Sequence, residues 1–338
     1  MRVLTVNTGS SSLKLALFAV SPDPDYSATR EHAADAAGLA GAASFAAALQ
    51  RLLPPQAPEA IGHRIVAPLD WTAPRRLDAS LDAELQALVP LAPDHLSQAL
   101  AAVAATRTAF PGVPQVACSD SAFHATLPEV ARILPLPPAR TDGALRRYGY
   151  HGLSCEYALS VLGAEDPSLA DGRIVIAHLG HGCSLTAVRG GRSLDTTMGF
   201  TPLGGLVMST RSGELDPGVL LYLLQQEKLS PESLSRLLNH ESGLLGISGL
   251  SGDMNALLAS PAPAARLAVD VFVYQARKYL GAMAAVLGGI DLLVFTGGIG
   301  ENSEEIRSRI AAGLAQNARV IRADEDLMIA RHTARAVS

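Results

Sequence analysis

The stretch that decides the fold is RVLTVNTGSSSLKLALFAV, residues 2–20, in which two β-rich runs flank a turn of glycine and small hydroxyl residues. A second stretch, RIVIAHLGHGCSLTAVR at residues 173–189, repeats this order of strand, small-residue turn and strand. Turns of this composition between apolar runs are typical of β-hairpins. The repeat therefore predicts two similar halves.

Between and after these hairpins the chain alternates helix-prone and strand-like segments. Alanine-rich, helix-prone stretches are 33–53 and 81–110, and the strand-like run 292–295 precedes a helix-like segment at 303–314. Proline-rich punctuation at 54–55 and 135–138 predicts surface loops. Such alternation indicates an α/β architecture with helices covering sheets, and the cleft between two halves is the natural ligand site.

Size and composition narrow the class of protein. A length of 338 residues exceeds the usual ~100–200 residues of one domain, so two domains are expected. A net charge of -5 offers no basic excess to neutralise a nucleic-acid backbone. The longest apolar stretch, 279–290, is shorter than the ~20 residues that span a bilayer and contains glycines, so we expect the buried end of a helix. Neither nucleic acid nor a membrane is an expected partner.

The N-terminus and the cysteines favour a cytoplasmic location. Met1 and Arg2 lead straight into a strand-like run with no convincing cleavage site, so no targeting signal is predicted. Cys118, Cys155 and Cys183 are odd in number and form no CxxC pair. This pattern argues against a disulfide framework or a thiolate zinc site and is typical of a reducing cytosol. We expect all three to be small buried residues.

Three glycine clusters could approach phosphate oxygens. The turn within 7–14 presents backbone N–H groups and hydroxyls, followed by Lys14. It contains no P-loop motif, and an ordinary Ser/Gly hairpin is an equal alternative. Gly180-His181-Gly182 ends a predicted strand, and the cluster at 296–302 follows a strand and opens a helix-like segment. Each cluster alone is a weak signal.

Four charged or polar residues suggest chemistry. Arg64 and Arg211 carry planar guanidinium groups, which suit carboxylate and phosphoryl oxygens. Asp120 and His151 lie in apolar or aromatic company, which suggests an active site. The alternatives are solvated surface arginines and hydrogen-bonded structural groups.

Taken together and in this order, the motifs resemble the acetate kinase family of the acetate and sugar kinase, heat-shock chaperone and actin superfamily. The resemblance spans almost the whole chain, and the segments that match most closely are 7–14, 178–184, 196–203, 209–217 and 295–303. The resemblance implies an α/β fold of two similar actin-like (ribonuclease H-like) domains with an interdomain active-site cleft. It implies an acid- and phosphate-binding domain at 1–149, a nucleotide-binding and dimerisation domain at 150–323, and a C-terminal helix at about 324–338 that packs back on the first.

The same resemblance implies a role for individual positions. The catalytic residues would be Asp120, His151 and Arg211. The acid would be bound by Arg64, Val66, Asp94, His95, Tyr150 and Pro202. Mg²⁺ or Mn²⁺ would be held, directly or through water, by Asn7 and Glu325. ATP or ADP would contact Lys14, His178, Leu179, Gly180, His181, Gly182, Asp253, Met254, Asn255, Gly298, Ile299, Gly300, Glu301 and Asn302.

The implied activity is reversible, ATP-dependent phosphorylation of a short-chain carboxylate, acetate or propionate, by direct in-line transfer in a homodimer. A carboxylate is already a nucleophile at neutral pH, so Asp120 is expected to organise Mg²⁺, water or Arg211 and not to accept a proton. Two alternatives stay open: a nucleotide-binding homologue without kinase activity, and a sugar or polyol kinase of the same superfamily.

The expected acid pocket departs from that of the relatives. Where they place Leu and Phe, this chain has Asp94 and Tyr150, each of which adds a polar group that needs a partner if buried. Such a pocket predicts a small hydroxy acid as substrate. In the alternative, Asp94 turns to water, Tyr150 bonds the backbone, and acetate or propionate is the substrate.

Overall fold

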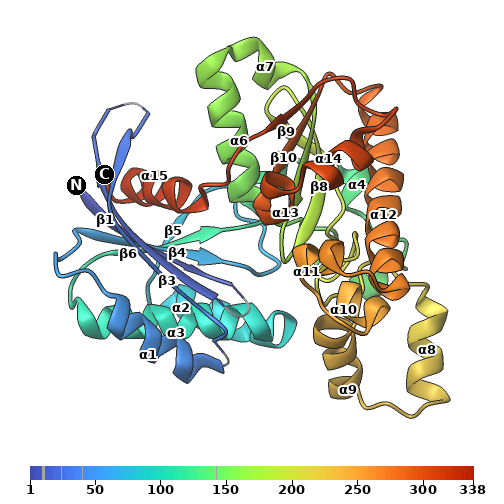
Figure 1. Cartoon of the computed structure of the whole chain (residues 1–338). Coiled ribbons are helices and arrows are strands. Elements are labelled where there is room, and N and C mark those ends of the chain that lie inside the picture. The colour runs from blue at the N-terminus through green and yellow to red at the C-terminus, as the bar shows by residue number, and fades with distance from the viewer. Residues whose placement is uncertain (10–11, 24, 40, 142) are drawn as a thin grey trace. The chain divides into compact units, whose positions relative to one another are not determined.

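The structure is a computed structural model that describes residues 1–338 except Ser10, Ser11, Pro24, Ala40 and Asp142. The predicted turn residues Ser10 and Ser11 thus lie outside the described residues. The chain divides into two compact units (Figure 1). Unit 1 comprises Met1–Ala125, Gly152–Tyr157 and Asp324–Ser338, and unit 2 comprises Thr126–His151 and Ala158–Ala323. The predicted domain bounds at 149/150 and 323/324, with their acid-binding and nucleotide-binding roles, stay a prediction.

Unit 1 is built on a six-stranded sheet with the order β3-β2-β1-β4-β6-β5. Its strands are β1 (Arg2–Thr8), β2 (Ser12–Val20), β3 (Ala28–Ala37), β4 (Ala60–Ile65), β5 (Arg75–Arg76) and β6 (Gln115–Ser119). β1 and β2 form the predicted antiparallel hairpin, and β3 continues it. β4 and β6 run parallel to β1, while β5 runs antiparallel to β6.

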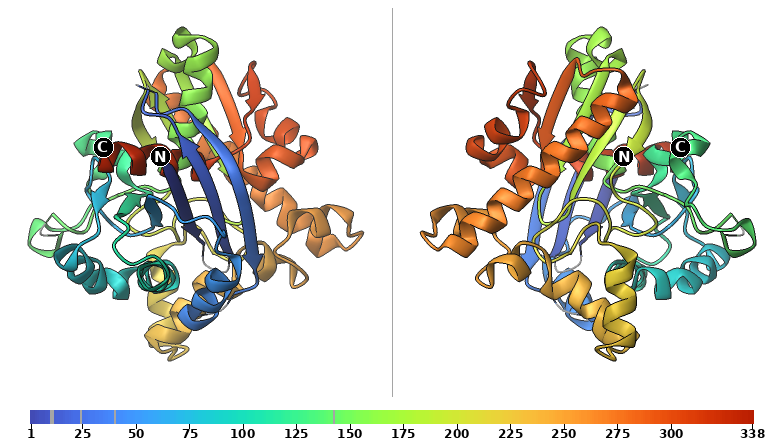
Figure 2. Two further views of the ribbon diagram at one scale, coloured as in Figure 1. Left: turned by 90° about the vertical axis from the view of Figure 1, so that its left-hand side faces the viewer. Right: turned by 90° about the vertical axis from the view of Figure 1, so that its right-hand side faces the viewer.

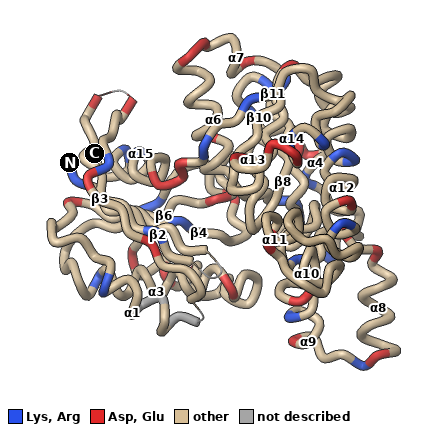
Figure 3. The backbone as a smooth tube through the Cα atoms, in the orientation of Figure 1, with Lys and Arg blue, Asp and Glu red and all other residues tan. Residues whose placement is uncertain are grey.

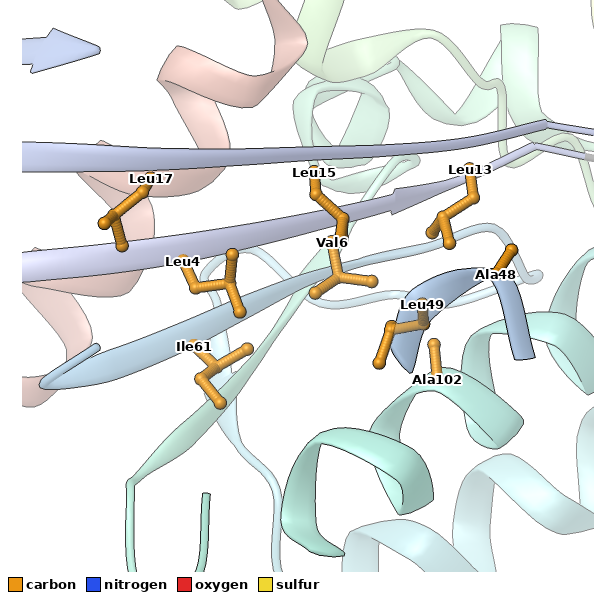
Figure 4. Packing of buried hydrophobic residues seen from close by; sticks show 9 residues of the cluster. All are labelled: Leu4, Val6, Leu13, Leu15, Leu17, Ala48, Leu49, Ile61 and Ala102. Carbon is orange, nitrogen blue, oxygen red and sulfur yellow. The ribbon is translucent and has the colours of Figure 1, made fainter. Parts of the chain in front are cut away.

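Helices cover both faces of this sheet, as the alternation of side chains along each strand requires. One face packs on α1 (Gly41–Leu52) and α3 (Pro93–Ala109), with α2 (Ala79–Leu88) beside α3 (Figure 1). Figure 4 shows its core of Leu4, Val6, Leu13, Leu15, Leu17, Ala48, Leu49, Ile61 and Ala102. The other face packs on α15 (Glu325–Val337) through Val3, Ala16, Phe18, Val20, Ala60, Ala330 and Ala334. Two short 3₁₀ helices lie at Val89–Leu91 and Ala122–Thr126.

The helix predicted from Ala33 is wrong in its first part. Residues up to Ala37 belong to β3, Gly38 has a left-handed φ of 69°, and α1 begins only at Gly41. β3 is an edge strand that pairs with β2 along nearly its whole length, and this pairing outweighs the weak helical preference of its alanines. The helix-prone stretch 81–110 is confirmed as α2 and α3 with a 3₁₀ turn between them. The predicted loops are confirmed in part, because Pro54 is buried and Pro138 begins the short helix α5 (Pro138–Thr141).

Unit 2 repeats the topology on a five-stranded sheet, β11-β10-β7-β8-β9. Its strands are β7 (Arg173–Leu179), β8 (Cys183–Arg189), β9 (Arg192–Thr196), β10 (Leu292–Thr296) and β11 (Ala318–Val320). β7 and β8 form the second predicted hairpin, β9 continues it, and β10 and β11 are parallel to β7. The order β9-β8-β7-β10-β11 matches β3-β2-β1-β4-β6 of unit 1, which confirms the two similar halves.

The long helix α12 (Pro263–Leu287) packs on β8 and β7 (Figure 2). It contains most of the predicted buried helix end, and Gly288, with a φ of 72°, closes it. The other helices are α4 (Glu129–Arg132), α6 (Gly152–Glu165), α7 (Pro167–Asp171), α8 (Pro217–Gln225), α9 (Pro231–Arg236), a π-helical turn (Leu237–Glu241), α10 (Gly243–Ser248), α11 (Met254–Ala259), α13 (Gly297–Asn302) and α14 (Glu304–Ala311). In the described part of the chain, none of the helices combines the length and the apolar character needed to cross a membrane.

Candidate active site

The parallel strands of unit 1 place three predicted site residues at one edge of its sheet. Asn7 lies near the end of β1, Arg64 near the end of β4, and Asp120 directly follows β6. The carboxyl ends of parallel strands meet at the same edge, which is where α/β proteins bind ligands. The sequence predicted each of these residues, and the fold brings them together.

Arg64 is the centre of this group. Its Nη2 lies 2.9 Å from Asp120 Oδ2, and its Nη1 lies 3.1 Å from Glu325 Oε2 and 3.2 Å from Asn7 Oδ1. Burial lowers the pKa of the Arg64 guanidinium, but the charges of Asp120 and Glu325 outweigh burial and raise the pKa above its usual value. Arg64 is therefore a permanent cation whose orientation its partners fix.

The first turn of α15 supplies the acidic partners. Asp324 caps the helix by accepting the N–H of Leu327 at 3.0 Å, and Glu325 and Asp326 follow in the first turn, where the helix dipole favours negative charge. Figure 3 shows this acidic start of α15. Asn7 Nδ2 donates to Glu325 Oε2 at 3.1 Å and to Asp326 Oδ1 at 3.2 Å. These two bonds turn the amide oxygen of Asn7 toward Arg64.

Asp326 was missed by sequence reasoning. Burial raises the pKa of its carboxyl group, and the hydrogen bond from Asn7 partly offsets that effect. Its position beside Glu325 was a signal, but the rotational phase of α15 decides which of three consecutive acids reaches Asn7.

The donor chemistry of this group suits a hard divalent cation. Asn7, Asp120, Glu325 and Asp326 offer amide and carboxylate oxygens, and two of the three carboxylates pair with the guanidinium of Arg64. Among the described residues no group of three or more His, Cys, Asp or Glu is placed to hold a metal ion. Mg²⁺ commonly takes water and substrate oxygens as ligands beside one or two carboxylates.

The remaining predicted residues of unit 1 lie on the same elements. Lys14 is exposed and pairs with Asn7 across the β1–β2 ladder. Val66 is buried just after β4, and Asp94 and His95 are half-buried in the first turn of α3.

The β7–β8 turn organises the predicted catalytic residues of unit 2. His178 and Ser184 face each other in the ladder. The ring of His151 stacks on that of His178, with centroids 4.1 Å apart and planes at 25°, and its Nδ1 lies 2.9 Å from Ser184 Oγ. His151 itself has a left-handed φ of 61°, a conformation that few non-glycine residues adopt.

His151 and Arg211 converge on Gly182. A Cβ atom at Gly182 would lie 3.2 Å from His151 Nε2 and 3.3 Å from Arg211 Nη1. Arg211 is buried, and its Nη1 donates to the Pro202 carbonyl at 3.3 Å. The absence of a side chain at position 182 thus leaves room for a nitrogen donor from each of two distant segments.

The predicted acid-pocket residue Tyr150 is fully buried, and its hydroxyl donates to the Phe200 carbonyl at 2.7 Å. This is the backbone hydrogen bond of the alternative stated above for the acid pocket. Because Phe200 and Pro202 lie on one segment, that segment bonds both Tyr150 and Arg211.

The third glycine cluster begins α13 directly after β10, as predicted. Gly297 has a φ of 76°, and a Cβ atom there would lie 2.8 Å from the Leu179 carbonyl oxygen, so only glycine lets the turn pack against the end of β7. Glu301 Oε1 accepts the N–H groups of Gly297 and Ala323, both at 2.9 Å, and Asn302 Nδ2 donates to Gly298 O at 2.8 Å. Ile299 and Gly300, the other predicted contacts of this cluster, lie in the same helix.

The other predicted nucleotide contacts lie around the β7–β8 turn and at the start of α11. Gly180 donates its N–H to Gly182 O at 3.0 Å, which tightens the β7–β8 turn. Burial lowers the pKa of His181, and the charges of Arg211 and His240 lower it further. Asp253 caps α11 by accepting the Ala256 N–H at 2.8 Å, with Met254 buried and Asn255 exposed behind it.

Solved structures with this architecture define the class of protein. An acetate kinase from Porphyromonas gingivalis matches with a TM-score of 0.84 and 29% identity, and the match covers 100% of both chains. A propionate kinase from Francisella tularensis matches with a TM-score of 0.84 and 30% identity over 99% of each chain. The fold is therefore the two-sheet α/β fold of the acetate and sugar kinase, heat-shock chaperone and actin superfamily.

The sequence narrows this class to one family. The model of the Acetokinase family matches residues 26–337. An acetate kinase from Methylocella silvestris is 41% identical in an alignment of 391 positions, which covers 98% of this chain and 96% of the relative. The chain belongs to the acetokinase family, which confirms the resemblance seen in its motifs.

Proposed function

We propose that the chain catalyses the reversible, ATP-dependent phosphorylation of a short-chain carboxylate, acetate or propionate, to the acyl phosphate. The observation that carries the proposal is the convergence of His151 Nε2 and Arg211 Nη1 on Gly182, because two donors at one point suit the oxygens of a phosphoryl group in transfer. The names of the relatives support the same chemistry.

The proposed step needs no proton. A carboxylate oxygen attacks the γ-phosphorus of ATP and forms the acyl–phosphate bond, while the bond to the β,γ-bridging oxygen breaks and ADP leaves with its electron pair. Arg211 and His151 offset the charge on the oxygens of the transferring group. Arg64, held by Asp120 and Glu325, would present its guanidinium to the acid. We also assign Val66 and Pro202 to the binding of the acid.

The nucleotide would be bound by residues of the β7–β8 turn and α13, together with Lys14 on β2 and the start of α11. We assign this role to Lys14, Asp253 to Asn255, 178–182 and 298–302. Mg²⁺ or Mn²⁺ would be held by Asn7 and Glu325, with Asp120 organising its surroundings. When bound, the ion would neutralise phosphate charge, a role for which the oxygen donors described above are suited.

The structure favours an unsubstituted acid over a hydroxy acid. The Tyr150 hydroxyl already donates to Phe200 O, so the phenol does not need a hydroxyl group of the substrate as partner. Acetate and propionate are therefore the proposed substrates, and glycolate, lactate and 3-hydroxypropionate are the comparison.

Trapping with hydroxylamine tests this function, because acyl phosphates form hydroxamates and sugar phosphates do not. ATP, Mg²⁺ and each acid should give a hydroxamate, fastest with acetate or propionate. ADP release with a sugar and no hydroxamate would indicate a sugar kinase, and ATP binding without turnover would indicate a homologue that is not a kinase. The role of Arg211 is tested by Arg211→Ala, which should lower kcat by roughly 100-fold with little change in KM. Asp94→Leu should leave the ranking of the acids unchanged.

We also propose a cytoplasmic homodimer joined through unit 2. Apolar side chains of α8 and α12 are strongly exposed, namely Val219, Leu221, Tyr222, Leu267 and Tyr274. Such surfaces are typical of protein interfaces. Light scattering should give a mass twice that of the chain, and a monomer at micromolar concentration would contradict the proposal. The three cysteines, all described, are buried and form no disulfide, which is compatible with a reducing compartment.

A further inference from the structure

The imidazole of His151 has two restraints of different kinds. Stacking on His178 fixes the plane of the ring, with centroids 4.1 Å apart and planes at 25°. Stacking alone does not decide which ring nitrogen faces Gly182, because a flipped ring lies in the same plane. The contact between Nδ1 and Ser184 Oγ, at 2.9 Å, does decide it and leaves Nε2 on the side of Gly182.

Ser184 is placed for this contact by the β7–β8 hairpin. Its position opposite His178 in the ladder puts both side chains on one face of the sheet, where His151 lies. Ser184 is fully buried, and the structure gives its hydroxyl no hydrogen-bond partner other than His151 among the described residues. A buried hydroxyl with one partner is committed to that partner.

The direction of this hydrogen bond sets the chemistry of Nε2. A neutral imidazole carries one N–H group. If Ser184 donates to Nδ1, the proton lies on Nε2, which can then donate to a phosphoryl oxygen. If Nδ1–H donates to Ser184, Nε2 presents a lone pair, which would repel that oxygen.

We propose that Ser184 is a positioning residue for phosphoryl transfer, whose hydroxyl donates to His151 Nδ1 and so holds the imidazole with Nε2–H directed past Gly182 at the transferring group. The inference rests on the proposed function for its chemistry. The hydrogen bond and the tautomer it fixes are properties of the protein and can be measured whether or not the function is correct.

The first test is the tautomer of His151 in the whole protein. Spectra of ¹⁵N-histidine-labelled wild type at a pH where the ring is neutral, assigned by the signals that His151→Gln removes, should show the proton on Nε2. A neutral ring with its proton on Nδ1 overturns the proposal. In Ser184→Ala the two neutral tautomers should mix, and an unchanged spectrum also counts against it.

The second test is kinetic. Ser184→Ala should lower kcat by about 10- to 100-fold and change both KM values by less than about threefold, since the hydrogen bond lost from Nε2–H is one that forms mainly in the transition state. Thr186→Val is the matched control, because Thr186 lies two residues further along β8, is equally buried, and bonds Thr196 Oγ1 at 3.0 Å. It removes a buried hydroxyl away from His151 and should leave kcat unchanged. Ser184→Thr, which keeps the hydroxyl, should retain most of the wild-type rate.

The outcomes separate the two proposals. A kcat loss in Thr186→Val as large as that in Ser184→Ala would show a general effect of β8 and overturn the role of Ser184. A wild type that forms no hydroxamate would refute the proposed function, while the tautomer of His151 would still test the hydrogen bond itself.

Discussion

Gly62→Ala tests whether the packing of α15 on β4 sets the geometry of the acidic group around Arg64. A Cβ atom at Gly62 would overlap Thr333 Oγ1 and lie 2.6 Å from Ile329 Cγ2, both on α15. Carbon atoms in contact prefer about 3.5–4.0 Å, so the helix must move away by roughly 1 Å. Overpacking of this kind costs about 1–3 kcal/mol, which corresponds to a fall in Tm of roughly 2–12 °C.

The same shift should reach the candidate site. The first turn of α15 carries Glu325 and Asp326, whose hydrogen bonds from Asn7 are 3.1 and 3.2 Å long and would not survive such a movement. A displacement of about 1 Å can lower kcat by about 100-fold, so we expect a 10- to 100-fold loss. Thermal unfolding followed by circular dichroism measures the first effect, and the hydroxamate rate measures the second.

Two further variants sharpen the test of α15. Gly281→Ala, in α12, is the matched control because no atom lies within 4 Å of its added Cβ, and alanine should stabilise that helix by about 0.5–1 kcal/mol. Adding Thr333→Ala to Gly62→Ala removes the overlapping oxygen and should recover part of the stability. A Gly62→Ala protein with the Tm and kcat of the wild type would refute the reasoning.

Two more predictions follow from single buried side chains. Burial lowers the pKa of His63 from 6.5 to about 4, against a hydrogen bond to Gln115, so the unfolded chain binds the extra proton first. The free energy of unfolding is therefore unaffected by His63 above pH 6.5, and it falls by about 3 kcal/mol as the pH falls toward 4. In His63→Asn, which cannot bind this proton, the free energy of unfolding measured in urea should depend less steeply on pH. An equal slope in both proteins would contradict this. Tyr150→Phe should cost about 1 kcal/mol and leave the acetate-to-glycolate ratio of kcat/KM within about twofold. A larger change in the ratio would show that the phenol contacts the acid.

The sequence predicts the fold well where local and long-range preferences agree. The runs at 2–20 and 173–189 form hairpins because apolar strands flank short turns, and pairing keeps those strands in place. The run Leu292–Thr296 is fully buried, and α13 starts directly after it, as its glycines suggest. These features can be predicted from residues that are close to one another in the sequence.

Other features depend on partners distant in sequence. β3 is a strand because β2 pairs with it, although its alanines favour a helix. Asp326 reaches Asn7 only because α15 lies on β1 and β4 with one particular phase. Ser184 contacts His151 through the register of the β7–β8 ladder. Sequence reasoning found most of the candidate residues through their motifs, Asp120, Glu325 and His178 among them. It missed Asp326 and Ser184, whose contacts depend on partners distant in sequence.

In both units the candidate reacting side chains are held in place by neighbouring side chains, but the charge of the group differs between the units. In unit 1 the cation of Arg64 is fixed by Asp120 and Glu325, so the group as a whole is acidic. In unit 2 His151 is fixed by His178 and Ser184 beside Arg211, so that group carries donors and positive charge. An acidic group with one fixed guanidinium suits a metal ion and a small carboxylate, whereas a group of donors suits phosphoryl oxygens. Each of these candidate side chains is held in place by a partner from a paired strand or a packed helix. The side chains would therefore need little reorganisation when the phosphoryl group passes from ATP to the acid.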